Sequence, residues 1–191
     1  MQTNKMEQLC ITTPRLLVRQ LQQSDLSDFH LYRSNPEVTK YQGFDVMTEE
    51  QAATFIHENA GKTFGKAGEW VQYAIANKET GRLTGDCAIK LDQHDMRIAE
   101  IGITISHLSQ NRGYAGEVMT GLLGFLFDEQ GIHRVVEIVD AENAPCIRML
   151  QRTGFRQEGH FNENIFFKGK WGSEYQFAML QKEWRERKNS Q

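Results

Sequence analysis

The sequence predicts a mixed α/β fold in which helices flank a central, mostly antiparallel sheet with one parallel crossover. Short runs rich in β-branched and aliphatic residues alternate with polar, glycine-containing turns, which is typical of antiparallel strands. One long helical pattern lies between two of these runs, and a strand–helix–strand connection of this kind implies a parallel strand pair.

One strand and two helices are expected ahead of the main sheet. Residues 13–19 mix aliphatic and β-branched residues after a proline, which can open a strand but cannot donate to its ladder. Ser24 can cap a helix over residues 25–33, which ends before an Asn-Pro pair. The Thr-Glu-Glu-Gln run at 48–51 resembles a capping box, so a second helix is expected to extend to about residue 60.

The main sheet is expected to begin with a meander of three strands, at residues 70–76, 83–91 and 98–106. In the long helix that follows, apolar residues recur at helical spacing from Ala115 until Gly131 ends the run. The later elements are a strand at 133–139, a short helix at 145–152 and, after Gly154-Phe155, a strand pair whose last member covers 174–180. The strands on either side of the long helix form the parallel pair.

A single domain is expected over residues 11–181, with terminal extensions at 1–10 and 182–191. The chain has 191 residues and shows no internal repeat or low-complexity linker. The polar final extension is expected to be a solvated, partly frayed end. Its mixed-charge run at 184–188 is compatible with an RNA contact, but a solvated tail is the simpler interpretation.

Composition excludes several classes of protein. A formal net charge of −3 and an isoelectric point near 6.1 lack the positive field of a non-specific nucleic-acid binder, so an anionic ligand must be held locally. Three cysteines without a CxxC pair fit a reduced compartment, and we expect a cytoplasmic protein without signal peptide or membrane span. Six scattered histidines lack metal-site spacing, so no metal is expected.

The segment Gln-Asn-Arg-Gly-Tyr-Ala at residues 110–115 is a candidate phosphate-binding loop. It lies between a predicted strand and the long helix, whose first backbone N–H groups have no partner within the helix and carry partial positive charge. Gly113 has no β-carbon to keep a phosphate from the backbone. On this motif alone, the alternative that Gly113 only makes a tight turn stays open.

Several motifs, taken in order, resemble the GNAT acetyltransferase superfamily. Its cofactor loop, Gln/Arg-x-x-Gly-x-Gly/Ala, is matched by Gln110, Gly113 and Ala115. The order of Thr-Pro-Arg-Leu at 13–16, Glu-Ile-Gly-Ile at 100–103, the loop itself and the run 143–155 is similar to the branch of ribosomal-protein (alanine/serine) N-terminal acetyltransferases. This resemblance extends from about residue 11 to residue 180. It implies a GNAT-like acyl-CoA N-acyltransferase fold and transfer of an acetyl group from acetyl-CoA to a primary amine.

The same resemblance implies a coenzyme A site. The backbone of residues 103–105 would pair with the pantetheine arm, and residues 112–116 would hold the pyrophosphate. Asn143 would contact the coenzyme, although capping of the short helix is an equal alternative. The expected coenzyme-binding residues are Ile103, Thr104, Ile105, Gln110, Asn111, Arg112, Gly113, Tyr114, Ala115, Gly116, Asn143 and Arg148.

Three residues are candidates for the proton transfers. Glu100, on the strand before the loop, is a candidate base for the attacking amine, with a strand-ordering ion pair as the alternative. Cys146 stands where the family often has a serine thought to protonate the leaving thiolate; a buried, cleft-lining cysteine is the alternative. Glu163, on a later strand whose register the sequence does not fix, is the second candidate base, and a solvated carboxylate explains it equally.

The acceptor and the assembly state are open at this point. The N-terminus of a ribosomal protein is the first candidate acceptor and a small amine (an amino acid, polyamine or antibiotic) the second, with residues 41–47 as the acceptor-side loop. A coenzyme A-binding module without turnover is the competing class, because a cysteine replaces the serine. A nucleotide-binding Rossmann domain is excluded, since the sequence has no G-x-G-x-x-G turn. A homodimer is the working expectation.

Overall fold

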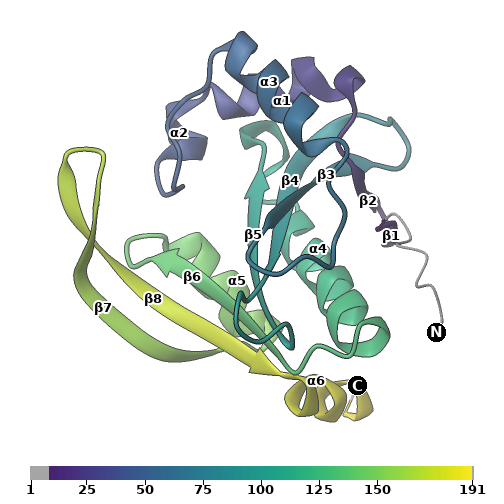
Figure 1. Ribbon diagram of the computed structural model, residues 1–191, viewed down its shortest axis with the longest axis vertical. Coiled ribbons are helices and arrows are strands. Elements are labelled where there is room, and N and C mark those ends of the chain that lie inside the picture. The colour runs from purple at the N-terminus through teal and green to yellow at the C-terminus, as the bar shows by residue number, and fades with distance from the viewer. Residues whose placement is uncertain (1–8, 191) are drawn as a thin grey trace.

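The computed structural model describes residues 9–190, in which eight strands form one sheet in the order β1-β2-β3-β4-β5-β6-β8-β7, flanked by helices (Figure 1). The strands are β1 (Ile11–Thr12), β2 (Leu16–Gln20), β3 (Trp70–Asn77), β4 (Leu83–Leu91), β5 (Ile98–Ile105), β6 (Arg134–Asp140), β7 (Arg156–Phe167) and β8 (Lys170–Leu180). The α-helices are α1 (Leu26–Arg33), α2 (Pro36–Thr39), α3 (Glu49–Asn59), α4 (Tyr114–Leu123), α5 (Ala144–Thr153) and α6 (Gln181–Asn189). Short turns of other helical types are η1 (Gln23–Asp25), η2 (His107–Ser109) and the π-helical η3 (Gly124–Glu129).

The predicted mixed sheet with one parallel pair is confirmed. Among the described strands β5 and β6 run parallel, and the other neighbouring pairs in the sheet are antiparallel. The crossover between β5 and β6 is α4 followed by η3. The pairing of β5 with β6 covers only three rows, from Ile98 opposite Arg134 to Glu100 opposite Val136. Beyond that row β5 continues beside β4 and β6 continues beside β8, so the two strands diverge (Figure 1).

Two hydrophobic clusters cover the two faces of the sheet. On one face, the apolar side of α4 packs with α5 against alternate residues of the strands, among them Ala99 and Ile101 of β5 and Val135 of β6. On the other face, α1 and α3 pack around Phe29 and Ile56. Because side chains alternate along a strand, successive residues of β5 and β6 point to opposite faces of the sheet, and only one of these faces is covered by the α4 cluster. The two strands therefore present different chemistry on the two faces.

Two terminal or connecting segments differ from the sequence-based expectation. The final extension is mostly exposed, as expected, but it is not a frayed end, because residues 181–189 form α6, in which Trp184 is 8% exposed and donates through Nε1 to Asp128 at 3.1 Å. The segment is polar except for this one aromatic residue, which packs against the rest of the protein and holds the helix in place. The short helix α2 was also not predicted. Pro36 begins it with Asn35 as its cap, whereas a proline was expected only to end the preceding helix.

No helix within residues 9–190 combines the length and apolar character needed to cross a bilayer.

The long β7–β8 hairpin projects from the sheet. It turns at Lys168 and Gly169, both with positive φ, and its pairing is interrupted between Phe161 and Ile165. In Figure 1 the hairpin tip lies next to the α2 segment. Lys168 joins the two segments, because its Nζ donates to the backbone carbonyl of Thr39 at 2.5 Å.

Candidate active site

The divergence of β5 from β6 leaves part of the β5 backbone without a strand neighbour. Residues 101–105 pair with β4 on one edge, while no described strand pairs with their other edge. Ile103 and Ile105 are half-buried against the α4 cluster, and the Thr104 side chain is buried on the opposite face. An unpaired strand edge presents backbone donors and acceptors in a row, as an extended amide-containing ligand requires.

The unpaired stretch of β5 leads within a few residues to the start of α4. Gly113 is the N-cap with φ 77°, and Asn111 also has a positive φ of 60°. Because Tyr114, Ala115 and Gly116 form the first turn, their backbone N–H groups lack helical partners. No hydrogen bond within residues 9–190 uses these three donors. The loop therefore presents several amide donors and the positive end of a helix dipole to one point.

Gln110 has a local role in this loop. Its Nε2 donates to the backbone carbonyl of Ile105 at 3.2 Å, which joins the end of β5 to the loop. Arg112 is exposed and lines a shallow hollow together with Tyr114. The structure thus brings the expected residues 103–105 and 110–116 together at one end of β5.

The first turn of α4 is held by the N-terminal segment of the chain. Glu117 accepts hydrogen bonds from the Thr13 hydroxyl at 2.6 Å and from the Arg15 backbone at 2.8 Å, and its carboxylate pairs with the Arg15 guanidinium at 2.7 Å. Burial works to raise the pKa of Glu117, but the bonds from Thr13 and Arg15 outweigh it and leave that pKa lowered. Arg15 also stacks over the Tyr114 ring at 4.6 Å. It thereby neutralises a carboxylate that would otherwise repel an anion at this helix end.

Glu100 lies at the last paired row of β5 and β6, on the face opposite α4. Its carboxylate contacts Lys90 Nζ at 2.5 Å, and both side chains are 27% exposed. Lys90 in turn lies over the ring of Trp70, 4.6 Å from its centroid. The ion pair considered as the alternative for Glu100 is therefore present. It leaves the carboxylate partly open at the point where the strands separate.

A second carboxyl group, which the sequence alone does not single out, lies at this point. Glu137 follows directly after the paired row on β6 and is 5% exposed, on the same face as Val135 and Val139. Its Oε1 accepts a hydrogen bond from the Cys146 thiol at 3.5 Å, while its Oε2 is buried with no partner within the described residues. The alternation of β6 placed Glu137 on an apolar face, which was the available signal.

Burial governs the protonation of this pair. Desolvation raises the pKa of Glu137 to about 8; the bond from Cys146 opposes the rise and the charge of Glu100 adds to it. Burial, followed by the influence of Glu137, also raises the pKa of the Cys146 thiol. Both groups therefore retain their protons at neutral pH, so Cys146 is not a thiolate nucleophile.

The other predicted residues of α5 are Asn143, which lies beside Cys146, and Arg148, which does not share its face of the helix. Asn143 is the N-cap of α5, and its Oδ1 accepts from the Cys146 backbone N–H at 3.3 Å. Asn143 therefore caps the helix, while its Nδ2 makes no hydrogen bond within the described residues. Arg148, one turn along the helix, is exposed.

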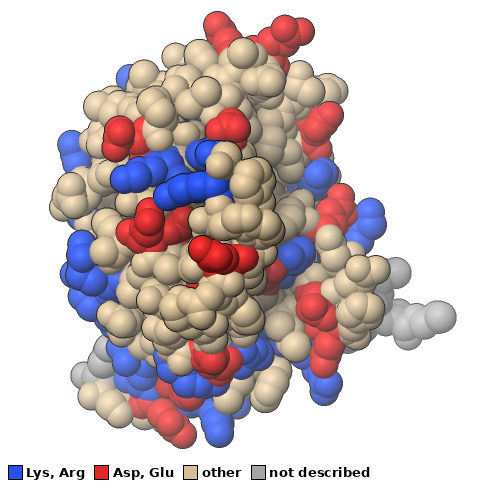
Figure 2. Space-filling model, turned by 90° about the vertical axis from the view of Figure 1, so that its left-hand side faces the viewer, with Lys and Arg blue, Asp and Glu red and all other residues tan. Residues whose placement is uncertain are grey.

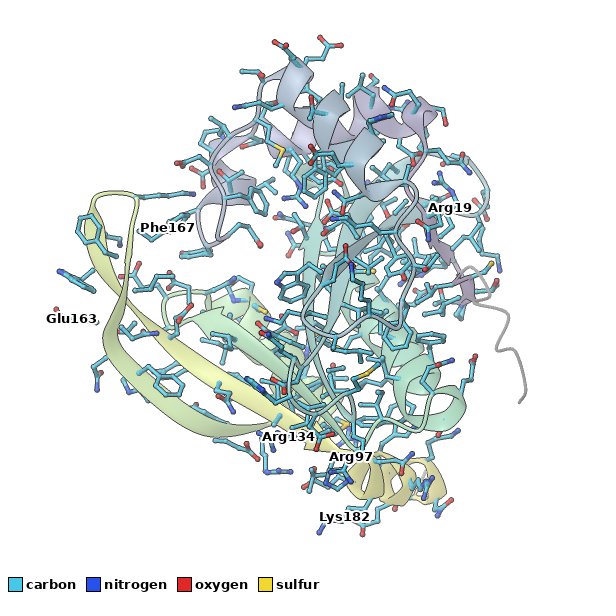
Figure 3. The ribbon with its side chains drawn as sticks, viewed as in Figure 1. Arg19, Arg97, Arg134, Glu163, Phe167 and Lys182 are labelled. Atoms are coloured by element: carbon cyan, nitrogen blue, oxygen red, sulfur yellow. The ribbon has the colours of Figure 1, made fainter. Side chains whose placement is uncertain are left out.

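Glu163 lies apart from these groups. It is exposed on β7 with φ 47°, at the interruption of the hairpin pairing, and its backbone N–H donates to Ser173 Oγ at 2.9 Å. Figure 3 shows it on the outer side of the hairpin, away from β5 and β6. The structure does not bring it to Glu100 or Cys146, because the irregular register of β7 turns this residue outward.

An open cleft of about 560 Å³ lies between the α2 segment and the β7–β8 hairpin. Ile138 and Asp140 of β6 form its floor, on the face of the sheet opposite Glu137. Most of the predicted acceptor-side loop lines one wall. Lysine and carboxylate side chains are interspersed over this side of the molecule (Figure 2), and those lining the cleft are Lys40, Asp45, Asp140, Glu142, Lys168, Lys170 and Glu174. Figure 3 places Phe167 at the hairpin wall, close to α2.

No group of three or more His, Cys, Asp or Glu side chains within residues 9–190 is arranged to hold a metal ion.

The family described as "Acetyltransferase (GNAT) domain" matches residues 15–156, which is most of the chain. The chain belongs to the GNAT acetyltransferases. It is therefore an acyltransferase, and acetyl-CoA is the donor that this family uses.

Three related proteins illustrate the membership. The uncharacterized N-acetyltransferase YnaD of Bacillus subtilis (strain 168) is 32% identical over 91% of this chain and 98% of its own length. A GNAT-family acetyltransferase structure from Bacillus anthracis has a TM-score of 0.82 and 28% identity, covering 91% of this chain and 99% of its own. Spermidine N(1)-acetyltransferase of Vibrio cholerae serotype O1 is 25% identical over 87% of this chain and 94% of its own length.

In this GNAT enzyme a buried ionic cluster connects the loop of residues 41–47 to the sheet. Asp86 of β4 accepts from the Tyr32 hydroxyl at 2.6 Å, from the Arg33 guanidinium at 2.7 Å and from Gln72 Nε2 at 2.6 Å. Arg33 is 2% exposed, and its guanidinium carbon lies 3.8 Å from the ring centroid of Phe44. The cluster thus connects β4 to α1 and to the loop that forms one wall of the cleft.

Proposed function

We propose that the protein transfers the acetyl group of acetyl-CoA to a primary amine by direct attack. The observation that carries this proposal is the continuity of the unpaired β5 edge with the amide donors at the start of α4. The first suits an amide-rich pantetheine arm and the second a pyrophosphate. The backbone of residues 103–105 would bind the arm, and residues 110–116 with Arg15 nearby would bind the phosphates. Asn143, which caps α5 beside Cys146, and Arg148 would also contact the coenzyme.

The acceptor would enter from the opposite face. The cleft floor, Ile138 and Asp140, alternates with Glu137 along β6, so the cleft opens on the face that carries Glu100. An amine arriving there would meet Glu100 as its proton acceptor, directly or through water. The coenzyme sulfur would leave toward Cys146 on the other face. Glu163 has no part in this scheme, because it points away from the opening.

The acceptor proposed first is the amino group of a protein N-terminus, following the resemblance to the ribosomal-protein branch. The cleft is open at the surface and large enough for a few residues of extended chain. A specific observation favours a second candidate, a small polyamine. Asp140 and Glu174 lie opposite each other on β6 and β8 at the cleft and form no ion pair within the described residues, so they would attract a cation. The spermidine-acetylating relative supports this candidate.

Coenzyme binding tests the donor half of the proposal. Gly113→Val is expected to weaken acetyl-CoA binding by at least ~10-fold, because a β-branched residue at positive φ is strained and its side chain occupies the phosphate position. Isothermal titration calorimetry of the folded variant measures the loss. Gly131→Val is the matched control, since Gly131 also has positive φ (67°) but ends the crossover away from the loop. Equal affinity of the wild type and Gly113→Val would contradict the assigned loop.

A panel of amines tests the acceptor half. Release of free thiol from acetyl-CoA is expected with peptides that begin with alanine or serine, and N-acetylated peptides serve as the blocked control. The double variant Asp140→Asn and Glu174→Gln is expected to raise KM about 10-fold or more for spermidine and much less for a singly charged peptide, because two carboxylates attract a polycation more strongly. Thiol release with spermidine alone would establish the second candidate. No release with any amine would reject the proposed transfer.

A further inference from the structure

Glu137 is a buried carboxyl group at the point where β5 and β6 separate. It is the first residue of β6 beyond the rows paired with β5, and its side chain is directed to the α5 face. One oxygen, Oε1, lies 3.5 Å from Cys146 Sγ, and the other has no hydrogen-bond partner within the described residues. An unpartnered buried polar atom is uncommon and costs free energy. Packing alone therefore does not account for a glutamate at this position.

The groups around Glu137 and Cys146 determine whether these two side chains are protonated. Cys146 approaches Glu137 from α5 and Glu100 acts on it from β5, whereas Phe177, paired opposite in β8, carries no charge. Because burial raises the pKa of Glu137 to about 8, the carboxyl is neutral at pH 7 and holds an O–H. The 3.5 Å contact then joins two protonated groups. The Cys146 thiol donates to Glu137 Oε1 in this arrangement. Rotation of the thiol about its Cβ–Sγ bond turns the S–H into the strand opening, and the Glu137 O–H then becomes the donor to Sγ.

We propose that Glu137 and Cys146 form a proton relay that protonates the thiolate departing from coenzyme A, an inference that rests on the proposed acetyl transfer. The amine nitrogen bonds to the thioester carbonyl carbon, the C–S bond breaks, and its electron pair goes to the sulfur. Cys146 gives its S–H proton to that sulfur, and Glu137 gives its O–H proton to Cys146 Sγ. The proton lost by the amine goes to Glu100 or water. A proton from solvent restores Glu137, so the count balances.

The relay explains how a buried cysteine can act as a proton donor. Burial raises the pKa of Cys146, so a thiol acting alone would leave an unfavourable buried thiolate. Glu137 is the stronger acid of the two, and it donates a proton to Cys146 Sγ in the same step. Glu100 and Glu137 then have different roles on the two faces of the sheet. Glu100, a partly exposed, ion-paired carboxylate, accepts the proton of the amine, and Glu137, a neutral carboxyl, supplies the proton on the thiol side. Two carboxyl groups in such different environments are a recurrent acid–base arrangement.

Kinetics of three variants test the relay: Glu137→Gln, Cys146→Ala and their combination. Each single variant is expected to lower kcat at pH 7 by ~10²-fold while KM for acetyl-CoA stays within about threefold. The double variant is expected to be no slower than either single variant, because both residues serve one proton path. Glu129→Gln, at an exposed residue of η3, is the matched control with unchanged kcat. Independent, multiplying losses would overturn the relay.

The pH profile separates the relay from a purely structural role. Wild-type kcat is expected to fall as the pH rises through about 8, when Glu137 loses its proton. The kcat of Glu137→Gln should not show this alkaline limb of the pH profile. Cys146→Ser should recover activity together with the limb, since a hydroxyl also passes a proton. Glu137→Leu provides a folded variant if glutamine is not tolerated. Persistence of the limb in either Glu137 variant overturns the relay alone, whereas a wild type inactive on every amine removes the relay together with the proposed function.

Discussion

Replacing Asp86 with alanine is expected to lower the free energy of unfolding by ~3–5 kcal/mol, because it leaves a buried guanidinium without its counter-charge. The Arg33 and Asp86 side chains are 3% and 1% exposed, so water cannot take the place of the carboxylate. The Tyr32 hydroxyl and Gln72 amide lose their acceptor in the same change. Urea unfolding at pH 7, followed by circular dichroism, measures the effect.

A surface ion pair serves as the control for Asp86. Glu142→Ala removes the partner of Lys170 in a pair whose side chains are 65% and 68% exposed, and its cost is expected to stay below ~1 kcal/mol. Changing both buried partners, with Asp86→Leu and Arg33→Met, should recover much of the loss because no unpaired charge remains. A cost for Asp86→Ala as small as that of Glu142→Ala would show that the cluster is not a stabilising anchor.

The second large effect is a pH dependence of stability that originates at Glu137. Its pKa is raised by burial from 4.5 to about 8, so between these values the folded state holds a proton that the unfolded state has released. Stability therefore falls as the pH rises from 4.5 to 8, and is flat with respect to this group above 8. Glu137→Gln, which cannot titrate, is expected to be more stable than the wild type at pH 8 by ~4 kcal/mol relative to their difference at pH 4.5.

Urea unfolding of both proteins at several pH values between 4.5 and 8.5 measures this difference. Subtracting the two curves removes the contribution of every other titrating group. Glu100→Gln provides a reference, because its side chain is 27% exposed and its carboxylate is paired with Lys90. Parallel stability curves for the wild type and Glu137→Gln would mean that Glu137 is ionised in the folded protein. That result would also remove the neutral carboxyl on which the relay depends.

The sequence was most informative where local rules decide the structure. Helical spacing located α4 and its continuation. The loop at Gly113 could be proposed because a residue without a β-carbon and the unpaired amides of a helix start are properties of a short segment. The strand alternation also placed Glu100 on the face opposite Ile101, as observed. These features depend on neighbours in the chain and need no knowledge of the tertiary structure.

The features that the sequence did not reveal depend on contacts between distant segments. Glu137 appears in the sequence as one charge in a strand, and only the end of the β5–β6 pairing shows that it stands beside Cys146 in the opening. The position of Glu163, apart from Glu100 and Cys146, could not be predicted because a break in hairpin register changes which way a side chain points. The final helix was missed because Trp184 is a lone apolar residue among charges, and its partner Asp128 lies 56 positions earlier.

The bond between Arg15 and Glu117 spans 102 positions of the chain. Synthesis on the ribosome produces Arg15 early, yet the carboxylate that holds it is translated only after more than half of the polypeptide. The contact that holds the first turn of α4 therefore cannot form before both distant segments have been synthesised and have docked. If this turn binds coenzyme A as proposed, a chain truncated before Glu117 should not bind the coenzyme, since the carboxylate that holds Arg15 would be missing.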